Sequence, residues 1–180
     1  QHFGTNFLTS SVEKVDDSKE PFFIRCQNGT EFLADTVIVA TGASAKYLGL
    51  PNEKQLIGKG VSACATCDGF FYKNKIVHVV GGGDTAMEEA MFLSKFAKHV
   101  YVIHRRDSLR ASKPMQKRAF DNPKVDFIWD STVIEILADS KGVNGIVVEN
   151  LKTKERTKRE TDGLFMAIGH TPNTKFLSER

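Results

Sequence analysis

The chain has 180 residues, of which 41% are hydrophobic and 26% are charged, and its formal net charge is +3. These values are typical of one or two globular domains, and the charge is too small to indicate a nucleic-acid partner. No apolar run reaches the roughly eighteen residues that a membrane span needs, so no membrane association is expected. Three cysteines are too few for a disulfide framework, which favours a reducing, cytoplasmic setting.

Residues 1–43 are expected to be rich in strands. Short apolar or alternating runs follow one another there, and Asn28-Gly29 is a typical hairpin turn between two of them. The run TVIVATGAS (36–44) is continuously apolar up to its Thr-Gly pair, which predicts a buried strand. Residues 44–60 contain three glycines and a proline, and this composition indicates a linker or a long loop.

A strand–helix–strand pattern begins at Lys75. KIVHVVGGG (75–83) is typical of a strand that enters a glycine turn, and residues 84–99 carry apolar side chains at helical spacing before the next strand, HVYVIHRR. This order predicts a parallel, right-handed βαβ unit. A further helix is expected around residues 112–120, and strands from about 131 to 160 are expected to form an antiparallel meander. The predicted class is therefore α/β: a Rossmann-like three-layer dinucleotide-binding domain with an antiparallel β-meander.

The glycine turn VVGGGDTA has the spacing of a dinucleotide-binding fingerprint. Gly81 would make the tight turn, Gly83 would let the backbone approach a pyrophosphate, and Ala86 would let helix and strand pack closely. The pyrophosphate is then expected at the helix N-terminus, where backbone N–H groups are free. The candidate cofactor-binding residues of this turn are Gly81, Gly82, Gly83, Asp84, Thr85 and Ala86.

The residues after the second strand distinguish NAD from NADP. About 20 residues beyond the glycines an NAD site carries an acidic residue, whereas HRRDSLR (104–110) is basic. A 2′-phosphate carries roughly −1.5 to −2 charges, so guanidinium groups would bind it and a carboxylate would repel it. The alternative interpretation is a solvated basic loop. The candidate NADPH ligands are His104, Arg105, Arg106 and Arg110.

Cys64 and Cys67 form a Cys-x-x-Cys pair within GVSACATCDGFFYKNK. Such a pair can be half of a zinc site, a structural disulfide or a redox couple. Zinc needs about four ligands, and no second pair or close histidine pair is present, so no metal site is expected. A thioredoxin fold does not fit either, because the dinucleotide strand follows the pair. A dithiol at the entrance of an NADP-binding domain remains.

Five motifs together resemble the low-molecular-weight thioredoxin reductases of the bacterial and plant type, over essentially the whole chain: VIVATGAS, CATCDG, VVGGGDTAMEEA, HRRDSLRASK and LFMAIGHTPNT. The resemblance implies a homodimeric flavoprotein that passes electrons from NADPH through FAD to the Cys64–Cys67 disulfide and on to thioredoxin. Cys67 would face the flavin, and Cys64 would attack the thioredoxin disulfide. Asp68 is the candidate acid–base residue, with a plain turn residue before Gly69 as the alternative.

The same resemblance implies a division into domains. Residues 49–163 would be the NADPH-binding domain that carries the dithiol, and residues 1–48 and 164–180 would be partial FAD-domain segments. Family members have a glycine-rich FAD fingerprint and a Gly-Asp motif that these 180 residues lack, so the chain is expected to be a fragment without turnover of its own. The residues that match segments near the flavin are Thr41, Gly42, Ile168 and Gly169.

Two other functions remain open at this point. A flavoprotein reductase of a peroxiredoxin shares the architecture, but its motif usually has Pro-His between the cysteines, so CATC favours thioredoxin. The chain could also be an NADP-binding module without turnover. In the leading hypothesis the two domains rotate about crossings at residues 44–51 and 159–164, with Gly49 and Gly163 as hinges.

Overall fold

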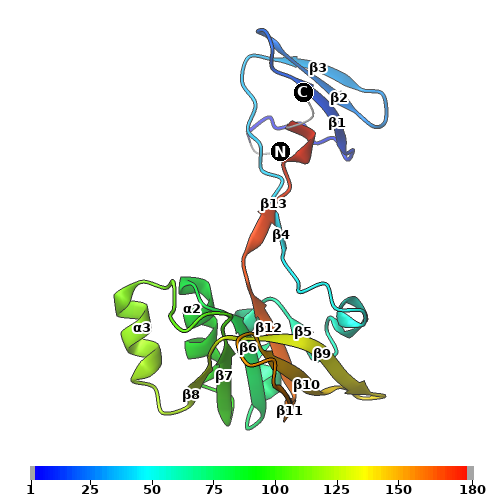
Figure 1. The fold of residues 1–180 in the computed structure, drawn as a ribbon. Helices are drawn as coiled ribbons and strands as arrows, with labels where there is room; N and C mark the ends of the chain where they lie inside the picture. Colours follow the sequence, from blue (N-terminus) through cyan, green and yellow to red (C-terminus); the bar gives the residue numbers. More distant parts are fainter. Residues whose placement is uncertain (1–2, 178–180) are drawn as a thin grey trace. The chain divides into compact units, whose positions relative to one another are not determined.

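The structure is a computed structural model that describes residues 3–177. The chain divides into two compact units: unit 1 comprises residues 1–44 and 171–180, and unit 2 comprises residues 45–170. Figure 1 labels the helices and strands of both. Within the described residues no helix combines the length and the apolar character that crossing a bilayer requires.

Unit 1 is built on an antiparallel sheet of three strands in the order β1-β2-β3. The strands are β1 (Val12–Asp16), β2 (Phe22–Cys26) and β3 (Glu31–Ala34). The hairpin predicted at Asn28-Gly29 is confirmed. Gly29 has a φ of 83°, and the Cys26 N–H donates to the Thr30 carbonyl at 2.9 Å, which closes the turn between β2 and β3.

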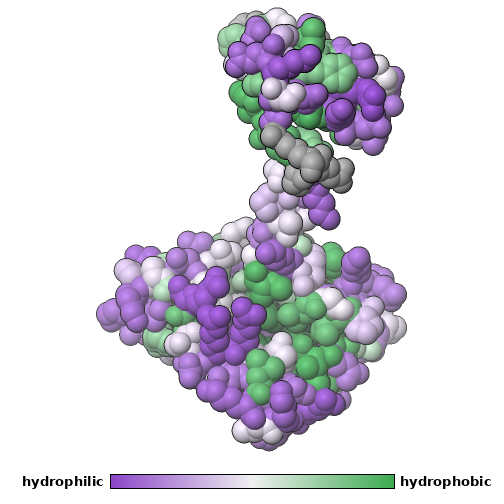
Figure 2. All heavy atoms as spheres, turned by 45° about the horizontal axis from the view of Figure 1, so that its top comes forward, coloured by the Kyte–Doolittle hydropathy of each residue, from purple (hydrophilic) through white to green (hydrophobic). Residues whose placement is uncertain are grey.

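The buried strand predicted at residues 36–44 is wrong for most of its length. Residues 36–42 form no strand and are exposed, with Ile38 at 93%. A strand requires a neighbour for its backbone groups, and within residues 3–177 none pairs with this run. Apolar side chains, including Phe32 and Leu33, accordingly remain on the surface of unit 1, where Figure 2 shows hydrophobic patches among hydrophilic ones.

The remaining short elements lie near the two points at which the chain passes from one unit to the other. β4 (Ala43–Ala45) pairs with β13 (His170–Pro172) in a two-stranded sheet, and η3 (Lys175–Leu177) follows.

Unit 2 has a parallel sheet of five strands in the order β5-β12-β6-β7-β8. The strands are β5 (Val61–Ser62), β6 (Ile76–Gly81), β7 (His99–Ile103), β8 (Val125–Ile128) and β12 (Gly163–Ala167). β6 and β7 are parallel neighbours, and α2 (Asp84–Leu93) connects them. The predicted βαβ unit is therefore confirmed.

The parallel sheet is the middle of three layers (Figure 1). α2 and α3 (Lys113–Phe120) cover one face, where Val77 and Val79 of β6 pack into a cluster with the buried side chains of α2. An antiparallel meander covers the other face, in the order β11-β10-β9, and packs against Val80. Its strands are β9 (Ser131–Asp139), β10 (Gly142–Asn150) and β11 (Arg156–Glu160). The predicted α/β class, three-layer architecture and meander are confirmed.

The linker predicted at residues 44–60 is ordered by a buried carboxylate. Glu53, the first residue of η1 (Glu53–Leu56), is 1% exposed. Its oxygens accept the N–H groups of Leu48, Gly49 and Leu50 at 3.0, 2.7 and 3.3 Å. Because these donors satisfy the buried charge, the turn at Gly49 has a defined conformation.

Gly163 does not lie at a crossing between the two units, contrary to the prediction. It is the first residue of β12, where it pairs with Val77 of β6. A Cβ atom built on Gly163 would run into the ring of Tyr72, the last residue of η2 (Gly69–Tyr72). The residue is glycine because an aromatic ring lies against its backbone. β12 lies within unit 2, which extends to His170.

We expect Gly163→Ala to lower the free energy of unfolding by about 1–3 kcal/mol, the usual cost of overpacking. The Tyr72 ring, which packs edge-on against Phe165 with centroids 5.1 Å apart, would have to move. Gly83→Ala is the matched control, because a Cβ there meets nothing within 4 Å and φ is −94°. Urea unfolding of both variants tests this, and equal stabilities would contradict it.

His78 lies in the middle of β6 and has no hydrogen-bond partner for either ring nitrogen among the described residues. It is 1% exposed and stacks on Tyr101, with ring centroids 5.1 Å apart. Burial lowers the pKa of His78 to about 3, and the charges of Arg159 and His99 add to the lowering. The ring is therefore neutral in the folded protein at neutral pH.

This buried histidine makes stability depend on pH in a defined direction. Since the folded-state pKa of His78 is about 3 and the ordinary value is 6.5, the unfolded chain binds the proton first as the pH falls. The stability that the neutral ring contributes is complete above pH 6.5 and is lost as the pH falls toward 3. We expect His78→Phe to lose less stability than the parent between about pH 7 and pH 5. Urea unfolding at several pH values measures this, and parallel stability curves would rule it out.

Candidate nucleotide and disulfide site

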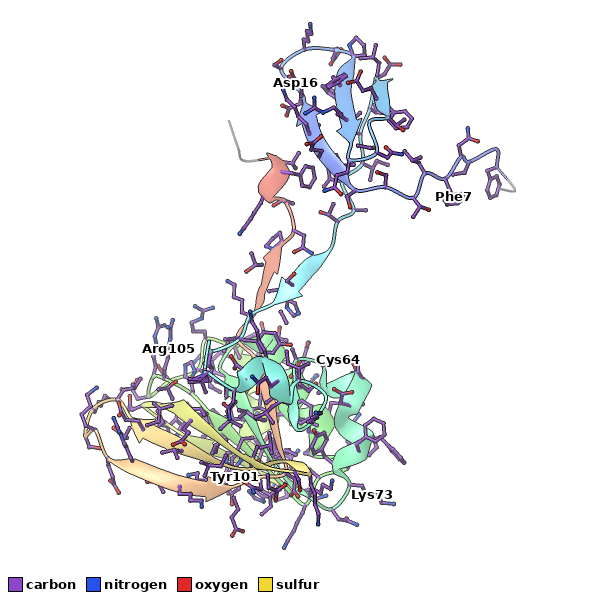
Figure 3. The ribbon with its side chains drawn as sticks, turned by 90° about the vertical axis from the view of Figure 1, so that its right-hand side faces the viewer. Phe7, Asp16, Cys64, Lys73, Tyr101 and Arg105 are labelled. Atoms are coloured by element: carbon purple, nitrogen blue, oxygen red, sulfur yellow. A yellow bond between two sulfur atoms is a disulfide. The ribbon has the colours of Figure 1, made fainter. Side chains whose placement is uncertain are left out.

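Unit 2 contains a cavity of about 570 Å³ at the edge of the parallel sheet where β6, β7 and β12 end. Figure 3 shows Arg105 and Cys64 toward one end of this unit and Tyr101 toward the other. The predicted site residues that line the cavity are Gly81, Gly82, Gly83, Asp84, Thr85, His104, Arg105, Arg106, Arg110, Ile168 and Gly169. Ala86 is fully buried below them.

The three glycines of the turn meet different surroundings. A Cβ at Gly81 would lie 2.8 Å from the Ala86 Cβ and would also meet the Ala167 carbonyl, so strand and helix approach each other only through a glycine. A Cβ at Gly82 would enter the His104 ring. A Cβ at Gly83 would meet no atom within 4 Å, and Gly83 lines the cavity. A ligand can therefore approach the backbone at Gly83.

The loop that carries the arginines is tied to this glycine turn. The Gly82 carbonyl accepts the N–H groups of Arg110 and Ala111 at 2.8 and 3.1 Å. Asp84, at the start of α2, accepts the N–H and the hydroxyl of Ser112 at 2.7 and 2.9 Å. Asp84 thus holds the loop that ends at Ser112. It positions the loop that carries Arg110.

The charges at the cavity fit an anionic ligand. Within residues 3–177 the side chains of Arg105, Arg106 and Arg110 are exposed and form no ion pair. Burial lowers the pKa of His104 below its ordinary value, and the arginine charges at 106 and 105 lower it further. Its Nε2 is buried without a partner among the described residues. Unpaired guanidinium groups and an unsatisfied ring nitrogen are what a phosphate-bearing nucleotide would satisfy.

Six residues of the cavity wall were missed by the sequence analysis: Val80, Ile103 and Ala167 on the strands that end there, and Leu48, Ser131 and Thr132 elsewhere. Leu48 is placed by the Glu53 carboxylate that accepts its N–H, and Ser131 and Thr132 begin β9. The Ser131 N–H donates to the His104 carbonyl at 2.9 Å, which joins the meander to the end of β7. No motif marks these positions, because their place in the wall depends on pairing between segments far apart in sequence.

The two cysteines are joined in a disulfide beside this region. Cys64 precedes α1 (Ala65–Asp68), and its sulfur is 2.02 Å from that of Cys67. The Cys64 sulfur accepts the Cys67 N–H at 3.2 Å and lies 3.4 Å from the Thr66 hydroxyl. Cys64 is half-buried, whereas Cys67 is exposed. These donors would stabilise a thiolate at Cys64 after reduction.

Ser62 connects the first cysteine to Asp68, and the sequence analysis did not identify it. Its hydroxyl accepts the Cys64 N–H at 3.0 Å and donates to Asp68 Oδ2 at 2.6 Å. Ser62 is 4% exposed, so the bridge is fixed inside the unit. The sequence signal that could have identified Ser62 is its position two residues before the first cysteine. Asp68 comes next to Ser62 only because the chain turns back through α1.

The remaining predicted site residues, Thr41 and Gly42, belong to unit 1. Both are exposed and bond through their carbonyls to Asn173, at 3.1 and 3.0 Å. Neither residue lines the cavity of unit 2. Within residues 3–177 no three His, Cys, Asp or Glu side chains are grouped to hold a metal ion.

Comparison with known proteins places this site in a family. The family model described as pyridine nucleotide-disulphide oxidoreductase matches residues 2–180. A thioredoxin reductase of Streptomyces coelicolor is 52% identical over 98% of this chain and 55% of its own length, and one of Coxiella burnetii is 47% identical over 100% and 57%. The chain spans little more than half the length of these relatives.

Solved structures agree. The thioredoxin reductase of Lactococcus lactis in its FR conformation has a TM-score of 0.86 and 40% identity, covering 94% of this chain and 56% of that one. That of Giardia duodenalis has a TM-score of 0.85 and 41% identity, covering 97% and 57%. This chain, with its disulfide and a cavity lined by the glycine turn, belongs to the pyridine nucleotide-disulphide oxidoreductase family and is a homologue of thioredoxin reductases.

Proposed function

We propose that this chain is the NADPH-binding and disulfide-exchanging part of a thioredoxin-disulfide reductase. One observation carries the proposal: the helix that opens at the cavity and the helix that bears the disulfide pack in the same core. Ala65 of α1 is 1% exposed and lies in one cluster with Met87, Ala90 and Leu93 of α2. The glycine turn that would bind the electron donor and the disulfide that would receive the electrons thus belong to one compact unit.

Different residues of the cavity would bind different parts of NADPH. The pyrophosphate would lie against the open backbone at Gly83 and the first N–H groups of α2. The 2′-phosphate would meet the unpaired guanidinium groups of Arg105 and Arg106, with Arg110 held beside them by Gly82.

A flavin, when bound, supplies the two-electron relay between a nicotinamide and a disulfide. Thr41 and Gly42 from unit 1 and Ile168 and Gly169 are the residues of this chain proposed to lie nearest to it. The proposal for these four residues rests on the resemblance of their motifs.

The disulfide chemistry would use the bonds already present around Cys64. After reduction, the Cys67 N–H and the Thr66 hydroxyl would stabilise a Cys64 thiolate, which attacks one sulfur of the partner's disulfide. The partner's other sulfur leaves as a thiolate, and Cys67 then releases the partner by closing the Cys64–Cys67 disulfide. Asp68, which accepts the Ser62 hydroxyl, would exchange a proton with the thiol pair.

Thioredoxin is the proposed partner, as the names of the relatives indicate. Phe70 and Phe71 directly follow the disulfide helix and are 67% and 71% exposed. Exposed aromatic side chains beside a reactive group are typical of a surface that binds another protein. We further propose a cytoplasmic homodimer for the whole protein, in line with its few cysteines and with the family resemblance.

We expect Arg105→Ala/Arg106→Ala to lower the affinity for NADPH by at least about a hundredfold while leaving NADH binding nearly unchanged. Hydrogen bonds to charged groups are worth about 1.5–3 kcal/mol each, and two of them are lost. Calorimetric titration of this chain with both nucleotides measures the ratio. Arg118→Ala is the control, since Arg118 is exposed on α3 outside the cavity. An unchanged NADPH-to-NADH ratio would show that the arginines have another role.

We expect the Cys67→Ser chain to form a stable mixed disulfide with thioredoxin through Cys64, because no second thiol remains to resolve it. The probe is a thioredoxin with one active-site cysteine, activated as a mixed disulfide with an aromatic thiol. Capture by the Cys64→Ser chain should be slower by on the order of tenfold, because Cys67 lacks the donors that Cys64 has. Mass spectrometry gives both rates, and faster capture by Cys64→Ser would reverse the two roles. Cys26 is buried and should not react.

A further inference from the structure

A lysine of the antiparallel meander contacts the loop that carries the arginines. Lys152 lies in the turn between β10 and β11, and its Nζ is 3.3 Å from Asp107 Oδ2 and 2.9 Å from Asp130 Oδ2. Asp107 directly follows Arg106 in the sequence, and Asp130 directly precedes β9. One ammonium group therefore binds both an acidic residue of the arginine loop and an acidic residue at the start of the meander.

Backbone hydrogen bonds hold the same two segments together. The Asp130 N–H donates to the Arg106 carbonyl at 3.2 Å, and the Asp130 carbonyl accepts the Leu151 N–H at 2.6 Å. The side chain of Asn150 accepts the N–H of Lys152 at 2.9 Å, which orders the turn. The Asp130 side chain is only 19% exposed. The lysine therefore lies on a turn whose position relative to the arginine loop is fixed by the backbone.

Asp107 carries a charge that is unfavourable at a phosphate site. A carboxylate close to guanidinium groups would pair with them and would repel a 2′-phosphate. In the structure the Asp107 carboxylate contacts Lys152 instead, and the three arginines of HRRDSLR (104–110) take part in no ion pair within residues 3–177. Lys152 thus neutralises the one acidic side chain of this run.

We propose that Lys152 is a positioning residue for nucleotide selectivity, which binds the Asp107 carboxylate and so keeps the guanidinium groups free for the 2′-phosphate of NADPH. It acts through Asp107, since Lys152 is not one of the described residues that line the cavity. The inference deepens the proposed function and rests on it for the identity of the nucleotide. The effect should be modest, because the side chains of Lys152 and Asp107 are 62% and 71% exposed, and exposed ion pairs change an equilibrium by a factor of about two to five.

The test is a double-mutant cycle on the 180-residue chain, read as the ratio of NADPH affinity to NADH affinity by calorimetric titration at low ionic strength. Lys152→Met, which keeps most of the aliphatic stem and removes the charge, should lower the ratio about threefold. Asp107→Asn should not lower it. In the Asp107→Asn background the further change Lys152→Met should have no effect, because no carboxylate is left for the lysine to neutralise.

The cycle separates this role from a direct attraction between the lysine and the phosphate. Direct attraction would make the loss on Lys152→Met equally large with Asp107 and with Asn at that position, and this result would overturn the proposal. Lys152→Arg keeps a cation at the same place and should retain the parent ratio. Lys158→Ala is the matched control, because it removes a positive charge from exposed β11 and Lys158 forms no ion pair within residues 3–177. An equal loss of the ratio in Lys158→Ala would also overturn the proposal.

Failure of this inference and failure of the proposed function give different results. If the parent chain does not prefer NADPH to NADH, the proposed nucleotide and this inference are both wrong. If the parent prefers NADPH and Lys152→Met keeps the full preference, only this inference is wrong.

Discussion

At Gly81 three segments approach one another more closely than any residue with a side chain would permit. The end of β6, the first turn of α2 and the end of β12 meet there, with the Ala86 Cβ and the Ala167 carbonyl occupying the space of a Cβ. Gly82 has the same relation to the His104 ring at the end of β7. These backbone contacts determine where α2 starts and how the arginine loop lies over the sheet edge. Glycine at both positions lets these segments pack together at the edge of the cavity.

α2 connects the cavity to the disulfide helix. Its first turn lines the cavity, and its buried face, with alanines at 86 and 90, lies in one cluster with Ala65 of α1. Small side chains allow such close packing of helices. The cavity and the disulfide therefore share one supporting helix, and a displacement of α2 would change the surroundings of both.

Two buried ionisable groups in unit 2, Glu53 and His78, illustrate how the surroundings of a side chain decide its role. Glu53 is surrounded by three backbone donors and orders a loop. His78 has no partner and remains neutral. The difference follows from the number of donors that reach each group, since a buried charge is stable only when hydrogen bonds or an opposite charge replace the lost water.

The sequence by itself determined the elements whose signals are local. Strand–helix–strand periodicity predicted the βαβ unit, the glycine spacing predicted the turn at 81–83, and the basic run at 104–110 lies at the same cavity. Tertiary structure alone decided which segments become partners. It left residues 36–42 exposed, placed Gly163 inside the sheet against Tyr72, and brought Ser62 to Asp68 and Ser131 to the cavity wall. Periodicity and turn chemistry act over a few residues, whereas burial and hydrogen bonding of these groups depend on neighbours that are distant in the chain.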